Sequence, residues 1–198
     1  MYGSATVIVE GATEVRCLEP ILKKLGSTND ERFSDIESLM DGCLFVSGEG
    51  NNIPKYCKIA IAQNANPVVL LDGDKAALAQ RIKDANQDVS IVLFDQGKEF
   101  EDIVPLEFYL AAISNELSSN AIMYEDEINV DNFSAWLEKS DIPRQMMISK
   151  KVEKWIRELC GGAYCKHVVM ESAIELTPAE QIETESFARL VESIRAAL

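Results

Sequence analysis

The chain lacks most of the side chains on which nucleophilic and zinc chemistry usually rest. Among 198 residues it has one histidine, His167, and five cysteines. A single histidine leaves few places for a Ser–His or Cys–His catalytic pair. The odd number of cysteines without a secretion signal predicts reduced thiols. Cys160, Cys165 and His167 form the one compact group with metal-like spacing. Because a structural zinc site normally takes four ligands, we interpret them as incidental or buried groups.

Long apolar runs and a basic N-terminal segment are also missing. No apolar stretch reaches the roughly 18–20 residues that a membrane span needs. The first residues, Met1 to Ser4, carry no positive charge and lead straight into a strand-like segment. The sequence therefore predicts a cytoplasmic protein without a membrane partner.

Basic residues are scarce relative to acidic ones. The chain has 19 Lys and Arg against 33 Asp and Glu, which gives a net charge of −14. This balance argues against simple electrostatic adhesion to nucleic acid, which relies on cations that neutralise phosphates. A metal-dependent enzyme that acts on nucleic acid stays open, because bound divalent ions supply positive charge locally.

Short β-branched segments alternate with helical patterns through the first half of the chain. The expected strands are 5–9, 43–46, 67–71 and 90–94. The expected helices are 13–25, 54–64 and 75–85, with a helical turn at 36–40. The segment 67–71 is apolar at consecutive positions, as in sheets covered on both faces. The pattern predicts an α/β fold with a mostly parallel sheet of about four strands flanked by helices.

The strand–helix alternation ends near residue 101. Residues 106–165 show helical patterns, and we interpret Trp136 and Trp155 there as core residues. From Lys166 a short apolar segment is expected, followed by a helix that starts at Pro178 and ends at Leu198. The sequence thus predicts a core at 1–105, a helical insertion at 106–165, and a return to the core at 166–198.

Acidic residues follow three of the expected strands. In a parallel sheet, ligands gather at the carboxyl ends of the strands. Hard divalent ions prefer carboxylate oxygens, and adjacent strand ends can hold one or two such ions. Taken singly, each acid is equally explained as turn or helix-cap chemistry. The residues concerned are Glu10, Glu14, Asp72, Asp74 and Glu101.

Together these motifs resemble the TOPRIM (topoisomerase–primase) domain, a Rossmann-like fold. The matching segments are Val7-Ile-Val-Glu-Gly-x-x-Glu14 and Val68-Val-Leu-Leu-Asp-Gly-Asp74. Within that superfamily the chain looks most like the nuclease domain of the OLD (overcoming lysogenization defect) family. The Ser47-Gly-x-Gly-Asn51 turn and the Glu101-Asp-Ile103 segment point to the same family. The resemblance implies a TOPRIM sheet with a helical insertion.

The resemblance also implies metal-dependent endonuclease activity on DNA, as in anti-phage defence, with RNA open as a substrate. It implies two Mg²⁺ or Mn²⁺ ions held by Glu10, Glu14, Asp72, Asp74 and Glu101. Glu10 and Asp72 are then catalytic, together with Lys166, which would offset charge on the reacting phosphate. Lys75 departs from this pattern, because no charge is required after the second aspartate.

OLD-type proteins carry an ATPase domain before the nuclease, but this chain has no Gly-x-x-x-x-Gly-Lys-Ser/Thr loop. We therefore expect self-association, or an ATPase domain or subunit, to hold the acidic chain on DNA. A basic strip is the expected accessory DNA contact, although Glu153 and Glu158 interleave with it as on an ordinary solvated face. The strip consists of Lys150, Lys151, Lys154 and Arg157.

Two other functions stay open. The segment that ends at Asp72-Gly-Asp74 also resembles the nucleophile strand of haloacid-dehalogenase-like phosphatases, with Asp72 as nucleophile and Asp74 as acid. That reading leaves Glu10 and Glu14 without a role. The other alternative is a non-catalytic TOPRIM-like module that binds nucleic acid or another protein.

Overall fold

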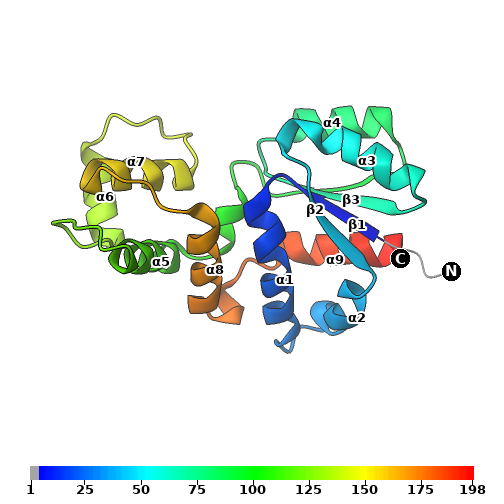
Figure 1. Ribbon diagram of the computed structural model, residues 1–198, viewed down its shortest axis with the longest axis horizontal. Coiled ribbons are helices and arrows are strands. Elements are labelled where there is room, and N and C mark those ends of the chain that lie inside the picture. Colours follow the sequence, from blue (N-terminus) through cyan, green and yellow to red (C-terminus); the bar gives the residue numbers. More distant parts are fainter. Residues whose placement is uncertain (1–4) are drawn as a thin grey trace. The chain divides into compact units, whose positions relative to one another are not determined.

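The computed structural model describes residues 5–198 and contains one four-stranded sheet within them (Figure 1). Every neighbouring pair is parallel, and the order is β2-β1-β3-β4. The strands are β1 (Ala5–Val9), β2 (Cys43–Ser47), β3 (Asn66–Leu71) and β4 (Ser90–Leu93). The two central strands, β1 and β3, are buried along almost their whole length. The predicted α/β fold with a parallel sheet is confirmed.

The chain divides into two compact units. The first, the α/β unit, contains the chain up to Phe100 and then Glu183–Leu198. The second, the helical unit, contains Glu101–Ile182. The sequence placed the return to the core at residue 166, whereas the contacts place it at residue 183. This difference arises because the segment that begins at Lys166 packs within the helical unit.

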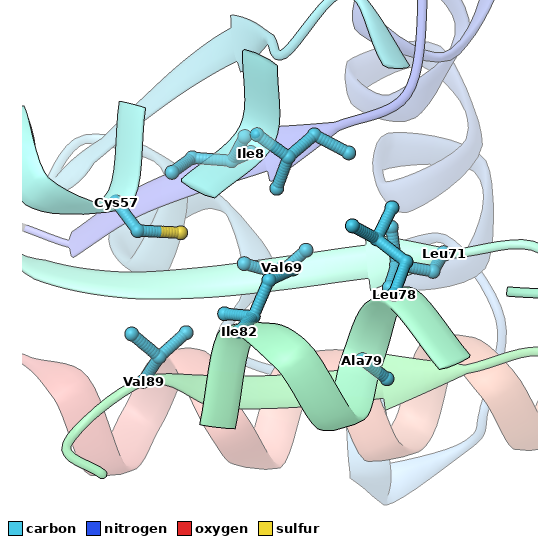
Figure 2. Close-up of a cluster of buried hydrophobic side chains, with 9 residues drawn as sticks. Ile8, Cys57, Val69, Leu71, Leu78, Ala79, Ile82 and Val89 are labelled. Atoms are coloured by element: carbon cyan, nitrogen blue, oxygen red, sulfur yellow. The ribbon is translucent and has the colours of Figure 1, made fainter. Parts of the chain in front are cut away.

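Helices cover both faces of the sheet in the α/β unit. They are α1 (Ala12–Gly26), α2 (Ile36–Met40), α3 (Ile53–Ala62), α4 (Ala76–Ala85) and α9 (Glu185–Ala197). Figure 1 shows α3 and α4 on one face and α1, α2 and α9 on the other. Figure 2 shows the core under α3 and α4, where Ile8 and Val69 of the sheet face Cys57 and Ile82. Burial on both faces explains why β1 and β3 have consecutive apolar residues.

The helical unit has four helices, α5 (Leu106–Ser119), α6 (Val130–Lys139), α7 (Ile148–Cys160) and α8 (Lys166–Leu176). Trp155 is buried and its ring centroid lies 5.3 Å from that of Phe133, which confirms it as a core residue. Trp136 is only half-buried, and its ring stacks on that of Phe133. In the part of the chain that is described, no helix has the length and hydropathy needed to cross a membrane.

The expectation of a short apolar segment after Lys166 named no helix, and the expected helix start at Pro178 was wrong. The segment after Lys166 is the helix α8, because Val169, Met170, Ala173 and Ile174 recur at helical spacing on one buried face. Pro178 does not start the last helix, because its backbone is extended and only a 3₁₀ turn follows, at Ala179–Gln181.

The last helix begins at Glu185 because Glu183 caps it. The Glu183 carboxylate accepts hydrogen bonds from the backbone N–H groups of Glu185, at 2.8 Å, and Ser186, at 3.1 Å. These bonds satisfy donors that the first turn of a helix leaves without an internal partner.

Candidate functional site

Glu10 and Asp72 lie side by side at one edge of the sheet. They directly follow β1 and β3, which are paired in parallel with Ile8 opposite Val69. The carboxyl ends of these strands therefore meet at the same edge. The Asp72 backbone N–H donates a hydrogen bond of 2.9 Å to Oε1 of Glu10. The two residues that the sequence selected from separate motifs are thus in direct contact.

The loop after β2 closes on the same edge. The Gly48 N–H donates to the Val9 carbonyl at 2.7 Å, and the Gly50 N–H donates to the Glu10 carbonyl at 2.9 Å. A Cβ on Gly48 would lie 2.3 Å from Cγ1 of Ile53. This glycine is therefore required for the loop to approach the end of β1, and it fixes the backbone that carries Glu10.

The Asp72-Gly73-Asp74 turn is held by backbone hydrogen bonds to the loop after β4. Oδ1 of Asp72 accepts the Phe100 N–H at 3.0 Å, and the Gly73 N–H donates to the Lys98 carbonyl at 2.8 Å. A Cβ on Gly73 would lie 2.0 Å from the Asp95 carbonyl oxygen. Only glycine fits between the two loops, so the spacing of the two aspartates depends on it.

Lys75 places a positive charge among these acids. Its Nζ lies 2.7 Å from Oδ1 of Asp74 and 3.7 Å from Oε2 of Glu10. The Glu10 side chain is 15% exposed, whereas that of Asp74 is 44% exposed. Burial lowers the pKa of Lys75, but the hydrogen bond to Asp74 and the charges of Glu10, Asp74 and Asp72 outweigh it, so that the pKa is raised.

Glu14 lies in the first turn of α1, and a Cβ on Gly11 would lie 3.1 Å from its Oε2. Its carboxylate therefore lies against the residue that follows Glu10, near a helix N-terminus that favours negative charge. Four of the five expected metal ligands thus belong to the α/β unit. Among residues 5–198, no three His, Cys, Asp or Glu side chains are arranged as a ready-made metal ligand set.

Glu101 and Lys166 form an ion pair in the helical unit, although 65 positions separate them in the sequence. Nζ of Lys166 lies 2.8 Å from Oε1 of Glu101, whose side chain is only 7% exposed. Lys166 is the first residue of α8. Its ammonium remains partly solvated, because 41% of its side chain is exposed. The sequence selected both residues for the same chemistry, and the fold of the helical unit brings them together.

Sequence reasoning missed three side chains close to Lys166. Both carboxylate oxygens of Glu116 accept the N–H of Cys165, at 3.0 and 3.2 Å, and so hold the start of α8. The hydroxyl groups of Tyr109 and Tyr164 lie 3.1 Å apart. Burial raises the pKa of Tyr164 to about 12. No spacing in the sequence marks these residues, because each acts through a contact between distant segments.

Two of the four cations in the predicted basic strip have partners within the helical unit. Arg157 pairs with Glu153 at 2.8 Å, and Nζ of Lys151 donates to the Arg144 carbonyl at 2.9 Å. Lys150 and Lys154 are exposed on α7. Their role in DNA contact remains a prediction.

The cysteines are free thiols, as the sequence suggested. Sγ of Cys160 lies 3.1 Å from the Ile156 carbonyl, and Sγ of Cys165 lies 3.2 Å from Nδ1 of His167. Cys160 therefore takes part in a helix-backbone contact, and Cys165 has a single imidazole neighbour.

Residues 1–74 match the family model for the TOPRIM domain of overcoming lysogenization defect protein-like proteins. The fold of the chain is similar to the C-terminal region of the Burkholderia pseudomallei OLD protein, with a TM-score of 0.61 and 17% identity over 100% of this chain and 99% of that one.

It is also similar to the C-terminal region of the Xanthomonas campestris pv. campestris OLD protein, with a TM-score of 0.58 and 17% identity over 99% of this chain and 94% of that one. No curated protein sequence matches the chain. The predicted TOPRIM resemblance is confirmed, and at this low identity the structural likeness establishes the fold.

Proposed function

We propose that this chain, which carries an OLD-like TOPRIM domain, is a metal-dependent endonuclease that cleaves DNA phosphodiester bonds. One observation carries the proposal. Glu10 and Asp72, from the two TOPRIM motifs, lie at adjacent parallel strand ends and are joined by a hydrogen bond of 2.9 Å. Strand ends of open α/β sheets are where such folds bind their ligands.

The chemistry of the site suits a hard divalent ion. All proposed ligands are carboxylates, which favour Mg²⁺ or Mn²⁺ over zinc. The ammonium of Lys75 already lies between Asp74 and Glu10, which indicates that these oxygens favour a cation. When bound, the metal would polarise the phosphoryl group and activate water. Calorimetric titration tests the sequence-based expectation of two ions.

The proposal gives the protein side chains separate tasks. Glu10, Glu14, Asp72 and Asp74 hold the metal, and the backbone bonds of Asp72 and Gly73 keep this carboxylate turn in place. Lys166 offsets the negative charge that develops on the phosphate. In the helical unit Glu101 holds the Lys166 ammonium at 2.8 Å. The sequence-based assignment of Glu101 as a further metal ligand also remains a prediction.

The hydrogen bond between Asp72 and Glu10 favours this function over the phosphatase alternative. A haloacid-dehalogenase-like mechanism needs Asp72 as the nucleophile and gives Glu10 no role. In this chain Glu10 is bonded to the backbone of Asp72 itself, and its second oxygen faces Lys75. Glu10 therefore belongs to the same group of side chains as Asp72, as the nuclease proposal requires.

A supercoiled-plasmid assay tests the proposal. Wild-type protein should nick or cleave the plasmid in Mg²⁺ or Mn²⁺, and EDTA should stop it. Asp72→Asn removes the charge but keeps an oxygen that can accept the Phe100 N–H, so the fold should persist while activity falls about a hundredfold or more. Glu10→Gln should have a similar effect. Glu19→Gln, on an exposed residue of α1 that pairs with Lys23, is the matched control.

The outcomes of this assay separate the nuclease proposal from its alternatives. Cleavage that survives both Glu10→Gln and Asp72→Asn would show that the proposed site is wrong. If folded wild-type protein binds DNA but never cleaves it, with or without an added ATPase partner, the non-catalytic module is favoured. Incubation of a labelled RNA with the same proteins and metals decides whether the substrate is DNA or RNA.

A further inference from the structure

Lys75 brings a positive charge to acids from two different strand ends. It follows the Asp72-Gly73-Asp74 turn directly and is the N-cap residue of α4. Its ammonium lies 2.7 Å from Asp74, which follows β3, and 3.7 Å from Glu10, which follows β1. The ammonium therefore lies where a bound cation would neutralise the same pair of acids.

A backbone hydrogen bond fixes the start of the Lys75 side chain. Its N–H donates to the Asp72 carbonyl at 3.0 Å, so the turn fixes where the side chain begins. The side chain is 34% exposed, so part of it remains in contact with solvent. Lys75 therefore lies among the acids and is still partly exposed to solvent.

The oxygens that Lys75 contacts are ones that a metal would need. Oε1 of Glu10 accepts the Asp72 N–H, and Oε2 of Glu10 faces Lys75. Oδ1 of Asp74 is bonded to Lys75 as well. A Mg²⁺ ion binds oxygens at about 2.0–2.1 Å, which is closer than an ammonium approaches. An ion bridging Glu10 and Asp74 would therefore have to displace Lys75.

We propose that Lys75 acts as a built-in cation that takes one of the two divalent-ion positions expected in this site. The chain then binds a single divalent ion through its remaining acids. This inference rests on the proposed metal-dependent function. The charges agree with it, because Glu10, Glu14, Asp72 and Asp74 carry four negative charges. One divalent ion with Lys75 leaves this group slightly negative, whereas two ions with Lys75 would make it positive.

Calorimetric titration of Mn²⁺ into metal-free protein tests the proposal without measuring activity. Wild type should bind one ion. Lys75→Gln should bind two ions, and the first about tenfold more tightly, because one positive charge near the site is gone. Lys75→Arg keeps the charge and should bind one ion, as wild type does.

Lys83→Gln provides the matched control. Lys83 lies on the same helix, eight residues or ~12 Å further along, and its ammonium contacts the Gln87 carbonyl. The variant makes the same change in net charge and should bind one ion with wild-type affinity. Thermal unfolding gives a second readout, because bound metal stabilises the fold. Mn²⁺ should raise the unfolding temperature of Lys75→Gln more than that of wild type.

The outcomes separate this inference from the proposed function. Two ions in wild type, or equal binding by wild type and Lys75→Gln, would overturn the role of Lys75 and leave the metal site intact. If Lys75→Gln and Lys83→Gln gain the same number of bound ions and the same affinity, the cause is the general surface charge. That result would also overturn the role of Lys75. If none of the proteins binds Mn²⁺, the metal site and the role of Lys75 both fail.

Discussion

The α/β unit and the helical unit position their candidate functional groups in different ways. In the α/β unit, hydrogen bonds donated by the backbone N–H groups of Asp72, Gly73 and Phe100, together with the close contact at Gly73, set the place of Asp72 and its turn. In the helical unit, Lys166 is placed by side chains, through its ion pair with Glu101 and the Glu116 bond that holds the start of α8. A turn that is fixed by close backbone contacts tolerates few substitutions. A side chain that is fixed by an ion pair can be replaced together with its partner. The two units should therefore respond differently to mutation.

The largest difference is expected at glycines. Gly73→Ala places a Cβ 2.0 Å from the Asp95 carbonyl oxygen, a backbone atom that cannot move without opening the loop after β4. We expect a loss of about 3 kcal/mol in the stability of the α/β unit, together with loss of metal binding. Urea unfolding and calorimetry measure the two effects.

Gly162→Ala is the counterpart in the helical unit. The Cβ there meets nothing closer than Sγ of Cys160 at 3.8 Å, which is an ordinary contact. Its stability should stay within about 0.5 kcal/mol of wild type. If the two alanine variants are equally stable, the close approach at Gly73 does not fix the turn.

The next effect concerns the Glu101–Lys166 pair. Lys166→Met should destabilise the helical unit by about 1–3 kcal/mol, because the carboxylate of Glu101 is buried and loses this ion pair. The double variant Lys166→Met with Glu101→Gln should regain much of that stability but no nuclease activity. Urea unfolding and plasmid cleavage, measured on the same samples, separate the structural role from the catalytic one.

An exposed pair in the α/β unit supplies the comparison. Lys98 and Asp95 lie 3.9 Å apart with both side chains about half exposed. Lys98→Met should change stability by less than about 0.5 kcal/mol. A double Lys166 and Glu101 variant that cleaves DNA as well as wild type would remove Lys166 from the chemistry.

A smaller effect is expected from the basic strip on α7. Reversing Lys150, Lys151 and Lys154 to Glu should weaken DNA binding about tenfold and lower its salt slope, since fewer phosphate contacts remain. Metal binding in the α/β unit should not change. Fluorescence anisotropy across a salt series measures both quantities.

Three exposed lysines of the α/β unit give a control with the same change in net charge. Reversal of Lys55, Lys58 and Lys83 to Glu alters the average field of the protein equally. If both triple variants lose DNA affinity to the same extent, the strip on α7 is not a specific contact.

The smallest effect is expected at a surface ion pair of the α/β unit. The hydrogen bond from Arg195 to Asp35 holds the pKa of that carboxyl below its ordinary 3.8. A lowered carboxyl pKa adds stability above pH 3.8 that is lost as the pH falls through the folded-state value. Because the pair is largely solvated, Asp35→Asn should cost less than about 1 kcal/mol at pH 7.

The pH dependence of this stability difference shows whether it comes from the charge of Asp35. In urea unfolding, the gap between Asp35→Asn and wild type should narrow as the pH falls below 3.8, where the wild-type carboxyl also loses its charge. The matched change Asp88→Asn, at an exposed residue in the loop before β4, is the control for the loss of one carboxylate. A gap that stays constant with pH would mean that the ion pair contributes nothing.

Local patterns were sufficient for the sheet of the α/β unit. The strands at 5–9, 43–46, 67–71 and 90–94 were predicted within one or two residues, because each is a short apolar run with a turn or helix signal beside it. The acids of the two motifs followed from the same reasoning, since parallel strands must end at one edge. The positions of Glu10 and Asp72 were therefore contained in the sequence.

The part of the chain after Lys166 shows where that reasoning fails. Only a short apolar segment was expected after Lys166, whereas packing on α5 makes it the helix α8. Pro178 resembled a helix start, but Glu183 caps the helix later in the chain. The buried face of α8 depends on α5, which a local window does not contain. The Glu183 cap is local, two residues before Glu185, and was overlooked in favour of the proline.

By itself the sequence determined the four strands of the parallel sheet, the helices between them and the acids at the strand ends, because periodicity and turn chemistry act over a few residues. Only the tertiary structure decided that Lys75 lies between Glu10 and Asp74, that Glu101 binds Lys166, and that the chain returns to the α/β unit at residue 183. Those features are contacts between separate segments, and such contacts exist only once the segments have packed.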